Sequence, residues 1–334
     1  MQRRKFFQLL TGMAASIPLS TRGSDPGSSD RLGPILPLRP LGASGVSVTC
    51  LGLGGFHIGW TTEALAEATI EAALEEGVRF FDTAESYGSG TSEERYGRYL
   101  TPHYRDQIFL MTKSTAKDGA SARRDIEDSL RRLQTDHLDL WQIHALASPD
   151  DVDARLKAGV LDEGLKAQSE GKIRHIGFTG HASPAALLRM LEKTSGGGSP
   201  FLTSQFPINP VDAAASNSFI QDVLPRIEES RITPLAMKTL ADGRFFGKKL
   251  QGDKVTWESS DPIVPDVLTV ADCIHFALSL PVAVLITGAE KPEFLREKAA
   301  LVRSFHQKSA ADRQAVIARV ATYAAAGTVE YYKS

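Results

Sequence analysis

Four titratable side chains stand at or just after the ends of three successive apolar runs in the sequence. Asp82 ends the first run and Tyr87 follows it; Lys113 ends the second run. His144 ends the third. Polar groups at such buried positions cost free energy unless they hydrogen-bond to one another. A carboxylate, a phenol, an amine and an imidazole that converge can hold and move a proton, so the spacing predicts a proton-transfer site.

The three runs belong to a longer pattern in which short apolar runs alternate with stretches of helical periodicity. Eight runs are predicted strands, at 46–53, 78–82, 108–113, 138–144, 173–179, 201–206, 233–238 and 283–287. Most begin about 30 residues after the previous one, which is the length of one βα unit. The pattern predicts an α/β protein with a closed (β/α)8 TIM barrel, because no Gly-x-Gly-x-x-Gly motif of a doubly wound sheet follows the first strand. Active sites of such barrels lie at the carboxyl ends of the strands, where the four titratable residues stand.

Several helical segments carry local start or stop signals. The segment 65–76 ends at Gly77, a residue that readily adopts the left-handed backbone of a helix end. Ser121 is a predicted N-cap of the helix that follows the third strand. A last helical segment around Val316 and Val320 is predicted to follow the eighth βα unit.

Composition excludes several classes of function. The chain has 334 residues with 38 Lys and Arg against 40 Asp and Glu, so its near-zero charge disfavours a nucleic-acid partner. Cys50 and Cys273 are the only cysteines, too few for a disulfide scaffold, a structural zinc site or a cysteine-ligated iron–sulfur cluster. No metal site is expected, and any redox chemistry must come from a bound group.

The amino terminus has the order of an export signal. Arg3, Arg4 and Lys5 precede an uncharged, mildly apolar stretch at 6–19, which is too short for a stable membrane anchor. The Arg-Arg-x-Phe order resembles the twin-arginine signal, which implies the export machinery as a partner and a periplasmic or exported protein. The alternative is a disordered basic tail on a cytoplasmic protein. The Gly-, Ser- and Pro-rich residues up to Pro40 have the composition of a tether, so we predict a signal peptide and tether over 1–38 and one barrel domain over 39–334.

One predicted loop is unusually long. Residues 239–265 follow the seventh strand and include Phe245, Phe246 and Trp257. Because loops of this length are commonly functional and this one leaves the carboxyl end of a strand, we expect a lid over the site.

The motifs at these strand ends resemble those of the aldo-keto reductase family. They are FDTAESYG at 81–88, TK at 112–113, QIH at 142–144 and LGLGG at 51–55 after an opening Arg39-Pro-Leu-Gly. The resemblance covers about residues 39–305. It implies a barrel enzyme that transfers a hydride between a nicotinamide cofactor and a carbonyl or alcohol substrate.

The family's catalytic tetrad falls on Asp82, Tyr87, Lys113 and His144. The resemblance implies that Tyr87 donates the proton to the developing alkoxide and that Lys113 makes its phenol more acidic. Asp82 would hold Lys113 in place, and His144 would orient the carbonyl oxygen.

The resemblance also implies where the cofactor binds. Thr179 and Gln205 are expected at the nicotinamide carboxamide, and Lys238 at the pyrophosphate. Met237 stands where relatives place an aromatic ring. The full set of implied cofactor residues is Gly55, Phe56, Asp82, Thr179, Gln205, Met237, Lys238, Leu240, Gly288, Glu290, Lys291 and Glu297.

Some positions depart from the family pattern. Gly180 cannot supply the amide of the usual Ser-Asn pair, and Lys298 replaces the Asn after Glu297. Glu290 stands where relatives offer a hydroxyl, with Phe294 in place of Arg or Gln. NADP is the family default, but a carboxylate would repel a 2′-phosphate and could accept a hydrogen bond from a free 2′-hydroxyl, which leaves NAD as an alternative. Lys291 and Arg296 remain as phosphate partners.

The leading hypothesis is an NAD(P)-dependent oxidoreductase that reduces an aldehyde or ketone to an alcohol, or catalyses the reverse reaction. The competing hypothesis is a redox-sensing, cofactor-binding regulatory module with little turnover, which the altered cofactor positions favour and the intact tetrad opposes. An isomerase or epimerase that uses hydride transfer on a sugar is a third alternative.

Overall fold

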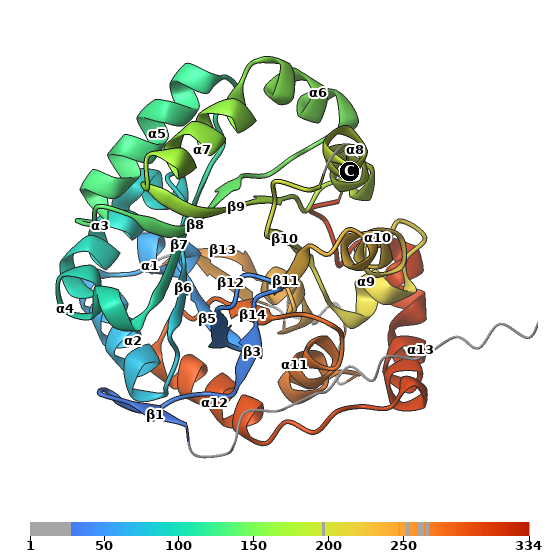
Figure 1. Cartoon of the computed structure of the whole chain (residues 1–334). Coiled ribbons are helices and arrows are strands. Elements are labelled where there is room, and N and C mark those ends of the chain that lie inside the picture. Colours follow the sequence, from blue (N-terminus) through green and yellow to red (C-terminus); the bar gives the residue numbers. More distant parts are fainter. Residues whose placement is uncertain are drawn as a thin grey trace, which may run out of the picture.

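The computed structural model describes residues 28–195, 198–246, 248–251, 254–258, 264 and 267–333. Eight parallel strands among these residues close into a barrel in the order β10-β11-β14-β5-β6-β7-β8-β9 (Figure 1). The strands are β5 (Leu51–Gly54), β6 (Phe80–Asp82), β7 (Phe109–Ser114), β8 (Leu138–Ile143), β9 (Ile173–Thr179), β10 (Thr203–Pro207), β11 (Thr233–Met237) and β14 (Val284–Thr287). The predicted (β/α)8 barrel is confirmed.

Helices surround the barrel on the outside (Figure 1). The longer ones are α2 (Glu63–Glu75), α3 (Thr91–Tyr99), α5 (Gly119–Arg132), α6 (Pro149–Lys157), α7 (Val160–Ser169), α8 (Pro184–Thr194), α10 (Leu224–Glu229), α11 (Val270–Leu278), α12 (Pro292–Arg303) and α13 (Ala310–Ala326). Short helices are α1 (Phe56–Trp60), α4 (Thr101–Tyr104) and α9 (Pro210–Ala214), and short turns are η1 (Tyr87–Gly90), η2 (Arg105–Gln107), η3 (Phe219–Val223) and η4 (Ala241–Phe246). None of the helices that the structure describes is both long and apolar enough to cross a bilayer.

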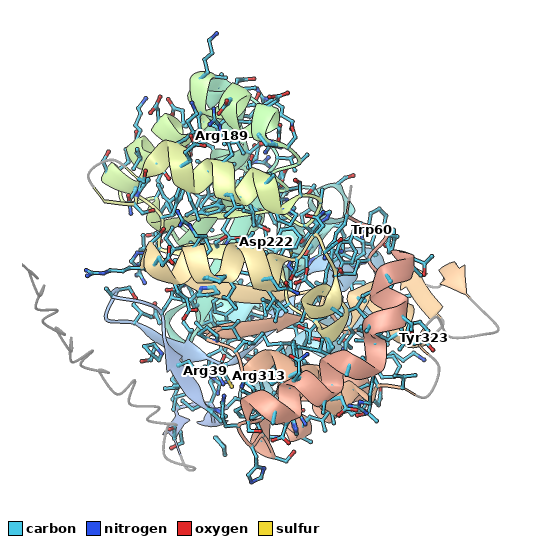
Figure 2. All side chains as sticks on the ribbon, turned by 90° about the vertical axis from the view of Figure 1, so that its right-hand side faces the viewer. Arg39, Trp60, Arg189, Asp222, Arg313 and Tyr323 are labelled. Atoms are coloured by element: carbon cyan, nitrogen blue, oxygen red, sulfur yellow. The ribbon has the colours of Figure 1, made fainter. Side chains whose placement is uncertain are left out.

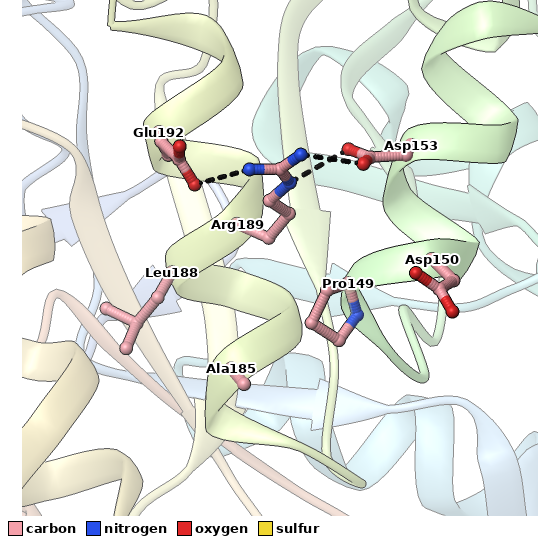
Figure 3. A pocket seen from close by; sticks show the side chains of 7 residues that line it. All are labelled: Pro149, Asp150, Asp153, Ala185, Leu188, Arg189 and Glu192. Carbon is pink, nitrogen blue, oxygen red and sulfur yellow. Dashed lines mark hydrogen bonds and ion pairs between the residues drawn. The ribbon is translucent and has the colours of Figure 1, made fainter.

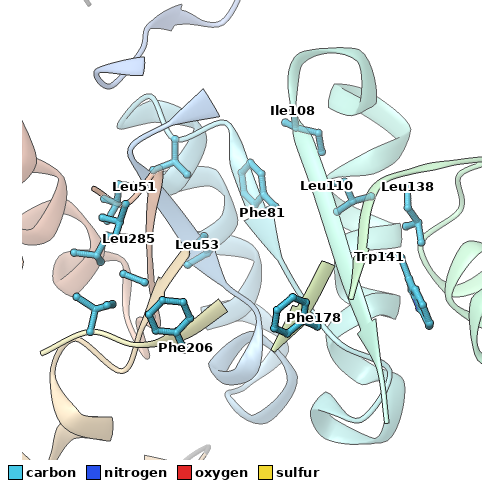
Figure 4. Close-up of a cluster of buried hydrophobic side chains, with 14 of the residues drawn as sticks. Leu51, Leu53, Phe81, Ile108, Leu110, Leu138, Trp141, Phe178, Phe206 and Leu285 are labelled. Carbon is cyan, nitrogen blue, oxygen red and sulfur yellow. The ribbon is translucent and has the colours of Figure 1, made fainter. Parts of the chain in front are cut away.

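Each strand sends alternate side chains to two different cores. One set, including Phe81, Leu110, Trp141 and Phe178, is buried against the helices (Figure 4). The other set fills the barrel, where Phe80 and Phe109 stack with ring centroids 5.0 Å apart. Each fully buried large apolar side chain contributes about 1.5–3 kcal/mol, so the two cores together hold the strand ends in fixed positions.

The first predicted strand is two elements. Residues 46–53 divide at Cys50 into β4 (Ser47–Thr49) and β5, and β4 pairs antiparallel with β3 (Leu38–Pro40). This hairpin closes the amino end of the barrel, because Leu41 and Val48 pack with its interior. Figure 2 shows Arg39 of the hairpin near one end of the barrel and Trp60 of α1 near the other.

Two local predictions differ from the structure. Asp118, not Ser121, caps α5, and its carboxylate accepts a hydrogen bond from the Ser121 backbone N–H. Residues 28–38 pack on the barrel instead of forming a tether, since β1 (Ser29–Asp30) and β2 (Gly33–Pro34) make a hairpin. Asp30 of this hairpin accepts a hydrogen bond of 2.6 Å from Arg79. Residues 1–27, which carry the predicted signal, lie outside the described residues.

The predicted long loop has structure of its own. After η4 it forms a two-stranded hairpin of β12 (Lys248–Gln251) and β13 (Lys254–Glu258). Phe245 at its start is 1% exposed and packs against α11, where Cys273 and Phe276 lie in the same cluster. This beginning of the segment is therefore anchored, and the lid remains a prediction for the rest. The helix end at Gly77, with φ of +77°, and the last helix around Val316 and Val320 are confirmed.

Candidate active site

The four predicted residues meet at the carboxyl end of the barrel. The Lys113 ammonium forms an ion pair with Asp82 and donates to the Thr83 carbonyl oxygen at 2.7 Å. Its Nζ also lies 3.2 Å from the Tyr87 phenol oxygen. Asp82 and Lys113 are 2% and 1% exposed, so this ion pair is shielded from water.

The strand register explains why these side chains converge. Asp82 lies two residues after Phe80, and Lys113 lies two and four residues after Met111 and Phe109, all of which point into the barrel. The same period of two carries the polar residues into the barrel above this apolar layer. Tyr87 begins the turn η1 instead of ending a strand, and this turn bends it back toward Lys113.

The electrostatics of the site favour a protonated Lys113 and a protonated Tyr87. Burial lowers the pKa of the Lys113 ammonium, but the charge of Asp82 and the hydrogen bonds to Asp82 and Tyr87 outweigh burial and raise it. Desolvation raises the pKa of the Tyr87 phenol, and Lys113 offsets only part of that increase. Lys113 does lower the pKa of this phenol, as expected, but burial, which the sequence does not show, raises it by more, so the phenol is less acidic than an ordinary tyrosine in the free protein. Tyr87 is therefore protonated and can donate its proton, and Lys113 would stabilise the phenolate that forms.

His144 stands beside Tyr87, and its surroundings favour the neutral imidazole. The two rings meet edge to face, with centroids 5.7 Å apart, and the His144 side chain is buried. Burial, together with the charge of Lys113, lowers the pKa of His144 well below its ordinary value. The next residue, Ala145, has a left-handed φ of +53°, a strained conformation of the kind found at functional sites. A neutral imidazole can orient a carbonyl oxygen by hydrogen bonding without competing with Tyr87 as the acid.

The neutral state of His144 predicts a specific loss of stability in acid. Below pH about 6.5 the unfolded chain binds a proton at His144 that the folded protein does not, so the free energy of unfolding should fall by up to about 1.4 kcal/mol per pH unit. His144→Gln cannot titrate and should lack this component. Chemical denaturation at pH 8 and pH 5 measures it: the variant should lose less stability than the wild type, and equal losses would contradict a neutral His144.

The predicted nicotinamide residues also lie next to the tetrad. The Phe56 ring meets Tyr87 edge to face at 5.5 Å. The Gln205 side chain hydrogen-bonds to Asp82, while its own Oε1 is buried without a hydrogen-bond partner. Gln205 and Thr179 are register neighbours on β10 and β9, so both line the same part of the rim. An unpartnered buried amide oxygen fits a ligand that donates a hydrogen bond at this point, as a carboxamide does.

The end of β11 contacts the carboxyl-terminal tail, which sequence reasoning missed. The Lys238 ammonium lies 4.7 Å from the centre of the Tyr332 ring, and His181 packs against the same ring at 6.0 Å. Asn209 donates to Glu330 at 2.9 Å and Lys333 donates to Asp212 at 2.6 Å, which fixes the tail to the barrel. Tyr332 lies more than ninety residues after Lys238, and no local pattern signals this contact.

Met237 and Leu240 take separate positions near Lys238. Met237 is half-buried at the end of β11, in register with Pro207 of β10. Leu240 packs on the cluster that contains Phe245, so its side chain contributes to the anchoring of the long loop.

A second missed residue, His57, lies against the end of β14. Its Nε2 is 3.1 Å from the Glu290 carboxylate, and its Nδ1 would lie 2.2 Å from a Cβ added at Gly288, so this close approach requires glycine. Lys298 is buried and donates to the Gly288 carbonyl oxygen at 2.6 Å. Lys291 and Glu297 are exposed. His57 follows the LGLGG motif directly, and that position is the one sequence signal that could have indicated it. Gly55 lies between β5 and α1, where its N–H donates to the Asp82 carbonyl oxygen at 2.6 Å.

A surface hollow lies elsewhere on the molecule, between α6 and α8 (Figure 3). Arg189 bridges Asp153 and Glu192 across it, with hydrogen bonds of 2.7 Å to each. Its described lining contains none of the predicted site residues. Among the residues that the structure describes, no group of three or more His, Cys, Asp or Glu could hold a metal ion.

Comparisons with known proteins point to one family. Residues 50–313 match the family model described as the aldo/keto reductase family. Aldo-keto reductase YhdN of Bacillus subtilis is 34% identical over 236 residues, which are 65% of this chain and 66% of the relative. The 6-dehydroglucose reductase of Novosphingobium aromaticivorans is 31% identical over 254 residues, 68% of this chain and 78% of the relative.

Solved structures share the same fold. The glycerol dehydrogenase of Gluconobacter oxydans superposes with a TM-score of 0.65 and 25% identity, covering 86% of this chain and 95% of that one. An aldo-keto reductase from Klebsiella pneumoniae, solved in complex with NADPH, has a TM-score of 0.62 and 24% identity over 85% of this chain and 94% of its own.

Proposed function

The chain belongs to the aldo/keto reductase family, and from this premise we propose that it is an NAD(P)-dependent oxidoreductase that reduces an aldehyde or ketone to an alcohol, or catalyses the reverse. The observation that carries the proposal is the Lys113 ammonium, which lies 3.2 Å from the Tyr87 phenol oxygen and is ion-paired with Asp82. A phenol with a fixed cation beside it can give up its proton to an alkoxide, because the cation stabilises the phenolate that remains.

Each tetrad residue has a distinct role in the proposal. Tyr87 protonates the oxygen of the substrate as negative charge develops on it, and Lys113 stabilises the Tyr87 anion. Asp82 fixes Lys113 and keeps it protonated. His144, neutral and beside Tyr87, donates a hydrogen bond that holds the carbonyl oxygen near the phenol. Reprotonation of Tyr87 from solvent completes the cycle.

A nicotinamide cofactor fits the residues around the tetrad. When bound, the nicotinamide would supply or accept the hydride. Gln205 Oε1, buried without a partner, would accept a hydrogen bond from the carboxamide, and Phe56 would pack beside the ring. Thr179, Met237 and Lys238 lie at the ends of β9 and β11, on either side of β10, and the Klebsiella pneumoniae relative was solved in complex with NADPH.

The direct test is turnover by the purified wild-type protein. Oxidation of NADH or NADPH, followed at 340 nm with a panel of aldehydes and ketones, should depend on the carbonyl substrate. Cofactor binding without any turnover across the panel would favour the second candidate, the redox-sensing module. That candidate is supported by Gly180, which has no side-chain amide, and by Lys298, whose ammonium is committed to the Gly288 carbonyl.

We also propose that the protein is exported folded through the twin-arginine pathway, on the sequence Arg3-Arg4-Lys5-Phe6. In a bacterium with this pathway, the wild type should reach the periplasmic fraction. The variant with Arg3→Lys and Arg4→Lys should stay in the cytoplasm, because the receptor reads the arginine pair. Immunoblots of the periplasmic and cytoplasmic fractions measure where each protein lies. A wild-type protein found only in the cytoplasm would contradict the export proposal.

A further inference from the structure

Glu290 and His57 form a pair just after β14, in the segment that the resemblance to aldo-keto reductases assigns to the adenosine end of the cofactor. Glu290 follows β14, and His57 reaches it from α1 across Gly288. Phe56, adjacent to His57, contacts Tyr87 at the reaction end of the site. The pair is therefore connected to the tetrad at the same barrel mouth through the neighbouring residues Phe56 and His57.

Glu290 carries a negative charge in the folded protein. Burial alone would raise the pKa of its carboxyl, but the hydrogen bond and charge of His57 lower it to about 2. The carboxylate is also held in place, since His57 Nε2 lies 3.1 Å from its oxygen and both side chains are partly buried.

The cations near Glu290 do not form a phosphate site. Arg296 is turned toward α2, where it bonds to Glu75 at 2.9 Å and lies 3.8 Å from Glu76. Lys298 is buried and donates to the Gly288 carbonyl oxygen at 2.6 Å. Phe294 is 42% exposed and adds no charge. Only the exposed Lys291 remains of the predicted phosphate partners.

Charge balance then distinguishes the two dinucleotides. With His57 neutral the pair carries one negative charge, and with His57 protonated it carries none, so in neither state is it cationic. A 2′-phosphate carries up to two negative charges and needs Arg or Lys donors. A free ribose 2′-hydroxyl instead donates a hydrogen bond to a carboxylate, as Asp or Glu does in other NAD sites.

We propose that the His57–Glu290 pair selects the dinucleotide with a free 2′-hydroxyl, so that this protein uses NAD(H) rather than NADP(H). The inference rests on the proposed function, because it assumes a nicotinamide dinucleotide along this wall. Glu290 then sets the cofactor specificity, and His57 holds the Glu290 carboxylate in position.

The test is a pair of binding constants. Fluorescence titration of the wild type with NADH and NADPH should show that NADH binds more tightly by about 100-fold, because the carboxylate both loses a hydrogen bond and repels the phosphate in NADPH. Glu290→Gln and Glu290→Ser remove the charge. Each should lower the ratio of the NADPH to the NADH dissociation constant by about tenfold or more, chiefly because NADPH binds more tightly. Two different substitutions guard against one that fails to fold, which thermal unfolding would reveal.

A matched control lies three residues further along the chain, at the start of α12. Glu293 is an exposed acid in the first turn of α12, so Glu293→Gln removes an equal charge away from His57 and should leave the ratio within about twofold. Wild-type protein that reduces carbonyls but binds NADPH as tightly as NADH would overturn the inference and leave the proposed function standing. Protein that binds neither dinucleotide would overturn both. A ratio unchanged in both Glu290 variants would show that another residue selects the cofactor.

Discussion

Tyr87→Phe is expected to lower kcat for carbonyl reduction by about 100- to 10,000-fold, the range typical of a lost general acid. The substitution removes one oxygen atom and keeps the ring, so the edge-to-face contacts with Phe56 and His144 should persist. Lys113 keeps Asp82 and the Thr83 carbonyl as partners. The dissociation constant of the dinucleotide should therefore change little. Steady-state kinetics with the best carbonyl substrate, together with fluorescence titration of the cofactor, measure the two effects.

A nearby buried tyrosine provides the control. Tyr96 of α3 is fully buried, and its phenol hydrogen-bonds to the Leu53 carbonyl at 3.4 Å instead of to Lys113. Tyr96→Phe should thus retain kcat within about threefold, since the phenol oxygen it loses makes only a weak structural hydrogen bond. Unchanged turnover in Tyr87→Phe would exclude Tyr87 as the acid. Equal losses in both variants would indicate a general structural effect instead of a chemical one.

Sequence alone could predict the barrel and the tetrad because both depend on local regularities. Each strand is a short apolar run, and in a parallel barrel all strand ends meet at one rim. The period of two that carries Phe80 inward also carries Asp82 inward, and the same holds for Met111 and Lys113. Side chains at strand ends could therefore be assigned to one site without coordinates.

What the sequence could not predict depends on contacts between distant residues or on burial. His57 and Glu290 are more than two hundred residues apart, and Tyr332 reaches Lys238 from a tail beyond the matched family region. The segment before Leu38 has a tether-like composition, yet the Arg79–Asp30 hydrogen bond holds it on the barrel. The net direction of the Tyr87 pKa shift could not be predicted for a related reason, because the desolvation that outweighs Lys113 is a property of the fold.

Lys113→Met is expected to affect both activity and stability. The ammonium that would stabilise the Tyr87 anion is gone, so kcat should fall at least as far as in Tyr87→Phe. Asp82, which is 2% exposed, loses its ionic partner, and an unpaired buried charge of this kind costs about 3–5 kcal/mol. Chemical denaturation should show this loss, and it should be smaller at low pH, where Asp82 can bind a proton and become neutral.

The double variant with Asp82→Asn and Lys113→Met separates the two effects. It removes both charges with little change in shape, so most of the lost stability should return, because a buried ion pair contributes little net free energy relative to neutral groups. Activity should not return, since no cation remains beside Tyr87. Recovery of stability without turnover would show that two neutral side chains at these positions let the protein fold equally well. The function of the buried pair would then be to place a positive charge next to the Tyr87 phenol. Recovery of turnover in the double variant would mean that the ammonium is not part of the proton-transfer step, and the role of Lys113 would then be confined to folding.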